Sequence, residues 1–87
     1  MDDLELIKLA GKAAEIEYTP ENNPLNDDAL ALRLMVNLGM DILFYGYKQT
    51  IIAVTHRTTT QEPYSFDMEA STRRAIVKAA AEIGKHK

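Results

Sequence analysis

DILFYGYKQTIIAVTH, residues 41–56, is the stretch that decides the fold of this chain. Two runs within it, 42–45 and 51–55, are rich in β-branched and aromatic residues and flank a short connection that begins at Gly46. That composition predicts a β-hairpin. The connection lacks an Asn-Gly pair, so the sequence does not define the register of the two strands.

Both faces of the predicted hairpin are apolar. Successive residues of a strand point to opposite faces, which places Ile42 and Phe44 on one face and Leu43 and Tyr45 on the other. A sheet with one face in water alternates more cleanly between apolar and polar residues. We therefore expect both faces to be covered, either by helices on both sides or by a second copy of the chain.

A helix is predicted after the hairpin, from Asp67 or Met68 to about Ile83, and Gly84 is expected to end it. Small side chains dominate its inward stripe, which implies close packing against the sheet: Ala75, Ile76, Ala79, Ala80 and Ile83. The polar connection between hairpin and helix, residues 57–64, extends the second strand or adds a short third one.

Two further helices are predicted before the hairpin. The first spans about residues 3–15 and contains Gly11, which we expect to allow close approach of another element, since glycine costs about 1 kcal/mol against alanine in a helix. Residues 16–18 alternate as a very short strand. The second spans 27–38, with Asn26 or Asp27 as its cap and Gly39 as a left-handed residue after its end.

These elements predict one α+β domain over residues 1–87. A small antiparallel sheet, built on the 41–56 hairpin with a possible third short strand, is packed by the N- and C-terminal helices. The helix at 27–38 is expected to fill a second side. Division of 87 residues would leave parts too small to bury their own cores.

Composition favours a reducing cytoplasm as the setting. The chain has no cysteine, which excludes disulfides, thiol nucleophiles and zinc–thiolate sites. Its first residues are acidic where a secretion signal is basic, and no run is long and apolar enough to span a membrane. The net charge of −3 argues against nucleic-acid binding driven by phosphate attraction.

Two segments resemble a known group of proteins. Residues 70–84, ASTRRAIVKAAAEIG, and residues 23–34, NPLNDDALALRL, are similar to two blocks of small uncharacterised proteins encoded by tailed phages and prophages. The layout is also similar to that of small phage α/β sandwich domains. Those proteins carry a longer strand region before the Asn-Pro-Leu block, where this chain has only residues 18–22, so the strand count stays open.

That resemblance supplies a setting and no mechanism. It implies a phage or prophage accessory protein that works in the cytoplasm of a bacterial host. The group brings no activity, cofactor or catalytic residue that could be transferred to positions of this chain.

An aromatic cluster is the best candidate for a protein interface. Tyrosine is common at interfaces because it joins an apolar ring to a polar tip. The alternative is ordinary filling of the core and the sheet edge, and the sequence favours neither strongly. The candidate residues are Leu43, Tyr45, Tyr47, Tyr64 and Phe66.

A basic cluster is the second candidate site. Arg57, Arg73, Arg74 and Lys78 offer cations that suit phosphate or an acidic partner. The simpler interpretation is a solvated helix face, since exposed charge is the default on a surface helix. We favour that interpretation, and nucleic acid is not an expected partner.

No catalytic, metal or cofactor site is predicted. Asp27 and Asp28, near Asn23 and Asn26, supply oxygens for a hard cation, but helix capping explains the same residues and is favoured. His56 and His86 stand without a nucleophile or carboxylate motif around them. No phosphate-binding loop or nucleophile elbow is present.

The leading hypothesis is therefore a non-enzymatic protein that binds a host or phage protein. Self-association of the chain is compatible with this hypothesis. A nucleic-acid-associated module is one alternative. A small enzyme or ligand-binding protein, with a pocket that the sequence does not reveal, is the other.

Overall fold

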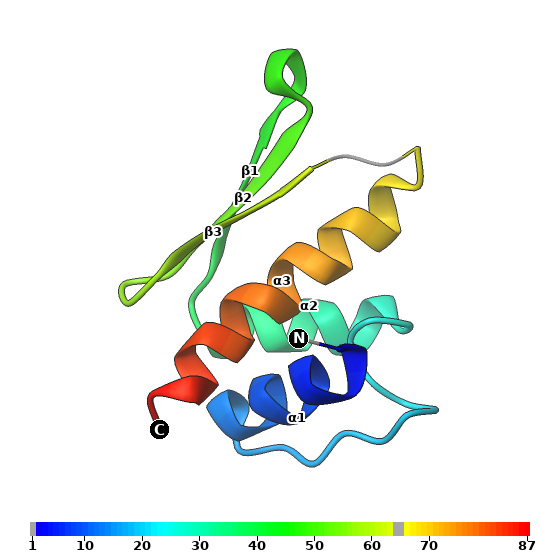
Figure 1. The fold of residues 1–87 in the computed structure, drawn as a ribbon, viewed down its shortest axis with the longest axis vertical. Coiled ribbons are helices and arrows are strands. Elements are labelled where there is room, and N and C mark those ends of the chain that lie inside the picture. The colour runs from blue at the N-terminus through cyan, green and yellow to red at the C-terminus, as the bar shows by residue number, and fades with distance from the viewer. Residues whose placement is uncertain (1, 64–65) are drawn as a thin grey trace.

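The computed structural model describes residues 2–63 and 66–87. Its elements follow in the order α1 (Asp3–Ala14), α2 (Asp28–Asn37), β1 (Asp41–Tyr45), the 3-10 turn η1 (Gly46–Lys48), β2 (Thr50–Val54), β3 (Thr59–Pro63) and α3 (Met68–Lys85). The predicted α+β class is confirmed (Figure 1). Residues 16–18 form no strand, so that prediction is wrong.

The described strands form one antiparallel sheet in the order β1-β2-β3. Ile52 of β2 pairs with Leu43 of β1 on one side and with Gln61 of β3 on the other. The predicted hairpin is therefore present, and β3 is the third short strand. The chain returns through β3 because the turn after β2 is closed by Thr55, whose hydroxyl accepts from the backbone amides of Arg57 and Thr58 at 3.2 and 3.1 Å.

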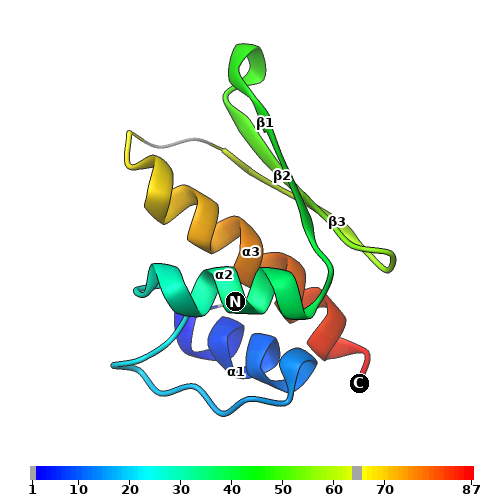
Figure 2. The ribbon, with the colours of Figure 1, turned by 180° about the vertical axis from the view of Figure 1, so that it is seen from behind.

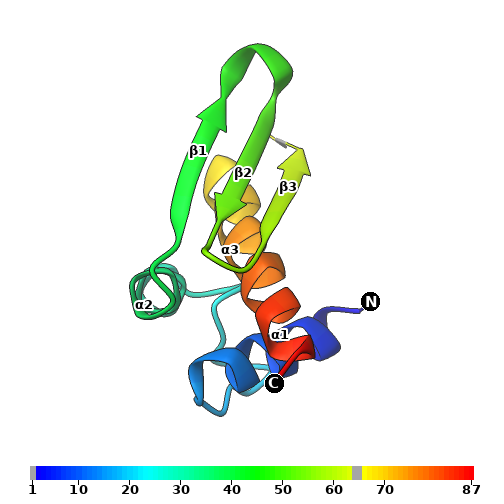
Figure 3. The same ribbon diagram turned by 90° about the vertical axis from the view of Figure 1, so that its left-hand side faces the viewer.

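The three described helices all lie on one side of the sheet (Figure 1). Helix α3 lies behind β2 and β3 when the sheet is viewed face-on, while α2 lies near the start of β1 (Figure 3). The expectation that α2 would fill a second side is wrong. Only three residues, 38–40, separate α2 from β1, so the helix stays beside the start of β1 (Figure 2).

The core lies between α3 and the rest of the molecule. Ile51 and Ala53 of β2 are fully buried on the helix side of the sheet. From the other helices, Ala10 and Leu34 are also fully buried in the same cluster. The predicted alanine stripe of α3 is confirmed as part of this core: Ala75, Ile76, Ala79 and Ala80.

An aspartate caps each described helix. The carboxylates of Asp2, Asp27 and Asp67 accept hydrogen bonds from amides three residues later, at 2.8, 3.0 and 2.9 Å. Each bond satisfies a first-turn N–H that has no partner within the helix. The prediction of a cap at Asn26 or Asp27 is confirmed, with Asp27 in that role.

Gly39 ends α2 as predicted, with a φ of +61°. Its amide donates to the carbonyl of Val36 at 3.2 Å, and the next amide, of Met40, donates to the carbonyl of Met35 at 3.0 Å. This pair of bonds is the Schellman motif. It turns the chain sharply from α2 into β1.

Gly84 does not end α3, so that prediction is wrong: the helix continues to Lys85. A Cβ atom at Gly84 would meet the backbone of Leu9 in α1, so the glycine allows the two helices to touch. Gly11 allows a similar close approach, because a Cβ there would meet the carbonyl oxygen of Ile16 and come within 3.3 Å of the Tyr18 ring. The predicted close approach at Gly11 is thus present, although its neighbour is the loop after α1 and not another helix or strand.

We expect Gly84→Ala to lower the free energy of unfolding by about 1–3 kcal/mol, the usual effect of overpacking. The added methyl would meet backbone atoms of Leu9, which cannot rotate away. Without this contact, the substitution would stabilise the helix by about 1 kcal/mol. Urea unfolding followed by circular dichroism shows whether the free energy of unfolding falls or rises.

The matched control is Gly46→Ala, because no atom lies within 4 Å of a Cβ built at Gly46. Its unfolding free energy is expected to stay within about 0.5 kcal/mol of wild type or to rise. A Gly84→Ala protein more stable than wild type would contradict the close contact between α1 and α3.

Candidate functional site

The predicted interface residues do not form one cluster. Leu43 and Tyr45 lie on the sheet face that no described helix covers, and Tyr47 lies in η1 at the hairpin tip. The rings of Tyr45 and Tyr47 meet edge to face, with centroids 6.3 Å apart. Phe66 is fully exposed just before α3. Tyr64 lies outside the described residues.

An apolar groove lies on the helix side of the sheet, between α2 and the first half of α3, and β1 borders it. We call it the α2–α3 groove. Its volume is about 400 Å³. Its apolar lining consists of Ala31, Leu32, Met35, Phe44, Met68 and Ile76. Asp28, Glu69, Thr72 and Arg73 also line it. An apolar groove with a few polar groups is the usual form of a site that binds a ligand or a peptide.

Phe44 is 53% exposed although it lies on the helix side of the sheet. Its register partner, Ile51, is fully buried against the core. The difference arises because α3 lies under β2 and β3, whereas β1 extends beyond it (Figure 3). The side chain of Phe44 consequently faces the α2–α3 groove and not the core.

The outer side of α2 carries two more exposed apolar side chains, Leu32 at 57% and Val36 at 69%. Neither residue was singled out from the sequence. A usable signal was present: DALALRLMVN is apolar on nearly every side. A surface helix normally has one apolar stripe and one polar face.

Strand β1 is an edge strand of the described sheet. An edge strand presents a row of backbone N–H and C=O groups to any further strand, and apolar side chains on it favour such pairing. Three consecutive residues of β1 are exposed and apolar or aromatic: Leu43, Phe44 and Tyr45. The edge and the α2–α3 groove meet at Phe44.

The predicted basic cluster is divided among several elements. Arg73 pairs with Asp28 at 2.7 Å and donates through Nε to the carbonyl of Leu25 at 2.8 Å. Arg74 pairs with Asp3, and Lys78 with Glu62, both at 2.9 Å. These three cations therefore connect α3 to the loop before α2, to α1 and to β3.

Arg57 is the one of the four predicted cations that does not lie on α3. It is exposed in the turn between β2 and β3 and lines a small cleft with Glu82 and His86, near the C-terminal end of α3. Glu82 marks the position of Arg57 along α3, because both line this cleft. The rise of the helix places Glu82 about 13 Å along the axis from Arg73. The four cations therefore do not face a common point.

The asparagines near Asp27 and Asp28 hold the loop before α2 together. Asn23 is buried, and its amide nitrogen donates to the carbonyls of Thr19 and Pro20, both at 3.0 Å. Its amide oxygen accepts from the amide of Leu25 at 2.9 Å. Within the described residues, 2–63 and 66–87, no group of three or more His, Cys, Asp or Glu side chains has the geometry for a metal ion.

The two histidines come from different parts of the chain. His56 is exposed in the β2–β3 turn, and His86 is exposed at the end of α3. Only His86 lines the small cleft that contains Arg57.

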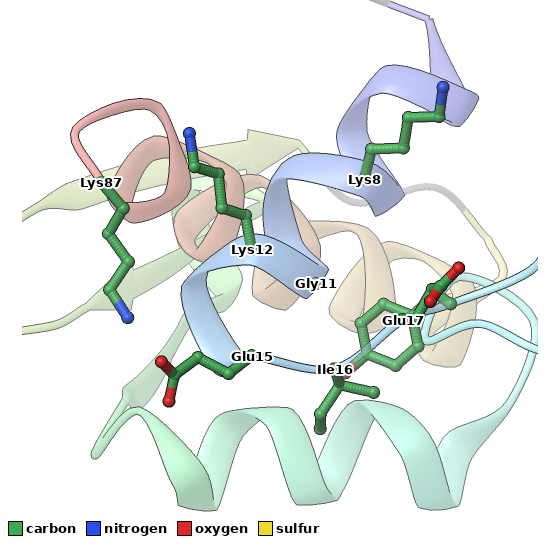
Figure 4. Close-up of a pocket in the computed structure, with 8 residues that line it drawn as sticks. Lys8, Gly11, Lys12, Glu15, Ile16, Glu17 and Lys87 are labelled. Carbon is green, nitrogen blue, oxygen red and sulfur yellow. The ribbon is translucent and has the colours of Figure 1, made fainter.

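A second groove, of about 770 Å³, lies beside the end of α1 (Figure 4). Lys8 and Lys12 extend from one face of the helix, and the Nζ of Lys87 donates to the carbonyl of Ala13 at 2.9 Å. Tyr18 also lines this groove, and its partial burial raises the pKa of the phenol.

Comparison with known proteins identifies no relative. No family model, no curated protein and no solved structure matches this chain. None of the described helices has the length and hydropathy that a bilayer crossing requires.

We expect Arg73→Ala to lower the free energy of unfolding by about 1.5–3 kcal/mol, the range for a hydrogen bond to a charged group. The substitution removes both the bond to Leu25 and the ion pair with Asp28. Arg74→Ala is the matched control, because the side chain of Arg74 is more exposed than that of Arg73 (38% against 20%) and its single ion pair with Asp3 belongs to a class that contributes about 0–1 kcal/mol. Equal effects in urea unfolding would contradict the structural role of Arg73.

We expect the stability of the protein to fall above about pH 10 through Tyr18. Because the folded-state pKa of this phenol is raised, the folded protein retains the proton after the unfolded chain has lost it. The contribution is therefore intact below the unfolded pKa and is lost as the pH rises toward the folded pKa. Urea unfolding at about pH 8 and about pH 11 measures the change.

Tyr18→Phe should show a smaller fall over the same interval, because phenylalanine does not titrate. The exposed Tyr47 supplies the control, since Tyr47→Phe should retain the fall seen in wild type. Identical pH dependence in wild type and Tyr18→Phe would contradict the raised pKa of Tyr18.

Proposed function

We propose that this chain is a non-enzymatic protein-binding module whose contact surface consists of the α2–α3 groove and strand β1. The observation that carries the proposal is that an apolar edge strand and an apolar groove meet at Phe44. The origin of the partner in a bacterial host or a phage stays a prediction, based on the resemblance of residues 23–34 and 70–84.

This surface combines two ways in which proteins bind one another. An edge strand supplies backbone hydrogen bonds to an added strand, and an adjacent pocket accepts its side chains. Large exposed apolar side chains that gather on one face mark interaction sites more often than scattered ones. Leu32 and Phe44 both line the α2–α3 groove, so their exposed apolar surfaces belong to the same site.

The alternatives have less support in the geometry. Three of the four predicted cations already pair with carboxylates. Of these four, Arg57 alone takes part in no ion pair of the described residues. Nucleic-acid binding stays a prediction without an observation that favours it. A small apolar ligand would fit the α2–α3 groove by volume, and the groove offers it few polar groups for orientation.

We expect Phe44→Ser and Leu32→Ser to abolish most capture of protein partners by the immobilised chain. Serine removes the apolar surface of the groove while the core residues stay in place. The measurement is an affinity capture from bacterial lysate that also contains an untagged copy of this chain, read by quantitative mass spectrometry.

Leu4→Ser is the matched control, because Leu4 is 48% exposed on α1, away from the groove. It should capture the same proteins as wild type. Loss of capture in the control, or full capture by both groove variants, would place the binding surface elsewhere. Far-ultraviolet circular dichroism checks that every variant is folded.

A further inference from the structure

We infer that the partner of strand β1 is a second copy of this chain, paired antiparallel about a two-fold axis so that the two sheets join edge to edge. The inference rests on the proposed function, since it names the partner that the surface binds. It starts from what lies at the two ends of β1.

An acidic group and an exposed apolar side chain lie at the start of β1. Asp41 is its first residue and is exposed. Only residues 38–40 separate it from α2, so the last turn of that helix, with the exposed Val36, lies beside this end of the strand (Figure 2).

The far end of β1 carries a basic and an apolar group. Lys48 and Tyr47 lie in η1, at the tip that projects beyond the helices (Figure 1). Tyr47 is 82% exposed, and the Nζ of Lys48 lies 5.7 Å from the centre of its ring. Among the ion pairs of residues 2–63 and 66–87, none includes Asp41 or Lys48.

Antiparallel pairing of two copies brings unlike ends together. With the two-fold axis near Phe44, Asp41 of one copy lies beside the η1 turn of the other, which contains Lys48, and the reverse holds at the other end of the strand pair. The hairpin tip of each copy lies beside the end of the other copy's α2, so Tyr47 meets Val36. An interface with two-fold symmetry must be complementary to itself, and these two ends of β1 are.

Other arrangements of the same edge lack this match. Parallel pairing of two copies would set Asp41 against Asp41 and Lys48 against Lys48, and like charges directly opposite are unfavourable. An unrelated strand would gain the backbone hydrogen bonds, but nothing in its sequence would have to match the charge order of β1. The order of acid and base along the edge therefore favours a second copy.

The same axis also joins the two grooves. A two-fold axis perpendicular to the sheet keeps the helices of both copies on one side of the joined strands. The α2–α3 grooves, each bordered by β1, then open toward one another beneath that pair. Phe44, on the helix side of β1, lies at the boundary between them.

The test is sedimentation velocity of purified wild-type protein at concentrations from about 1 µM to about 1 mM, a range that covers weak to moderate association. We expect a reversible monomer–dimer equilibrium within that range. Two variants reverse one charge each, Asp41→Lys and Lys48→Asp. Both positions are exposed, so the fold is expected to persist, and circular dichroism checks it.

Each variant alone should dimerise about tenfold more weakly than wild type, because both charge pairs of the dimer become repulsive. An equimolar mixture of the two variants should regain association near the wild-type level. In that mixed dimer the two substituted positions face one another with opposite charges, and the unchanged Lys48 of one copy faces the unchanged Asp41 of the other. Only a contact between copies at these positions produces recovery on mixing.

A wild-type chain that stays monomeric throughout the range would overturn the inference. So would a dimer whose dissociation constant neither single variant changes, or variants that fail to recover when mixed. If the monomer nevertheless captures a different protein through Phe44 and Leu32, the proposed function stands and only the identity of the partner is wrong. If neither association occurs, both proposals fail.

Discussion

The contact between the backbones of α1 and α3 holds the rest of the structure in place. It forms where Gly84 lies against Leu9, and it is possible only because no side chain separates them. On its other side, α3 presents small residues such as Ala75 and Ala79 to the sheet. One helix therefore serves as the core for layers on both of its sides. With no cysteine and few aromatic residues, close packing of small side chains takes the place of large ones.

Much of the fold could be predicted from local chemistry. The aspartate caps, the left-handed Gly39 and the β-branched runs of the hairpin each act within a few residues, so their signals are present in the sequence. Gly84 shows where such reasoning fails. A glycine near a helix end suggests a stop signal, but its role depends on Leu9, which lies far away in the sequence. The position of α2 on the same side as α3 is likewise a tertiary property that periodicity does not reveal.

The candidate surface was predicted only in part, for a related reason. The sequence shows that β1 is apolar on both faces, but not that α3 stops short of it. That displacement turns Phe44 from a core residue into part of a groove. The basic residues illustrate the converse. Arg73 and Lys78 look like surface charge in the sequence, yet each joins α3 to an element distant in the chain. A cation's role depends on whether a carboxylate lies within reach, which requires the tertiary structure.

The contact between Leu9 and Gly84 also determines when the protein can fold during its synthesis. Helix α1 leaves the ribosome before the other described elements, but a helix of 12 residues is only marginally stable in water without packing. Its main packing surface is α3, which is translated after the whole sheet. The N-terminal helix must therefore wait as a fluctuating segment while the hairpin forms. This order exposes the apolar edge strand early, so chaperones that recognise unpaired strands would meet β1 before the core is closed.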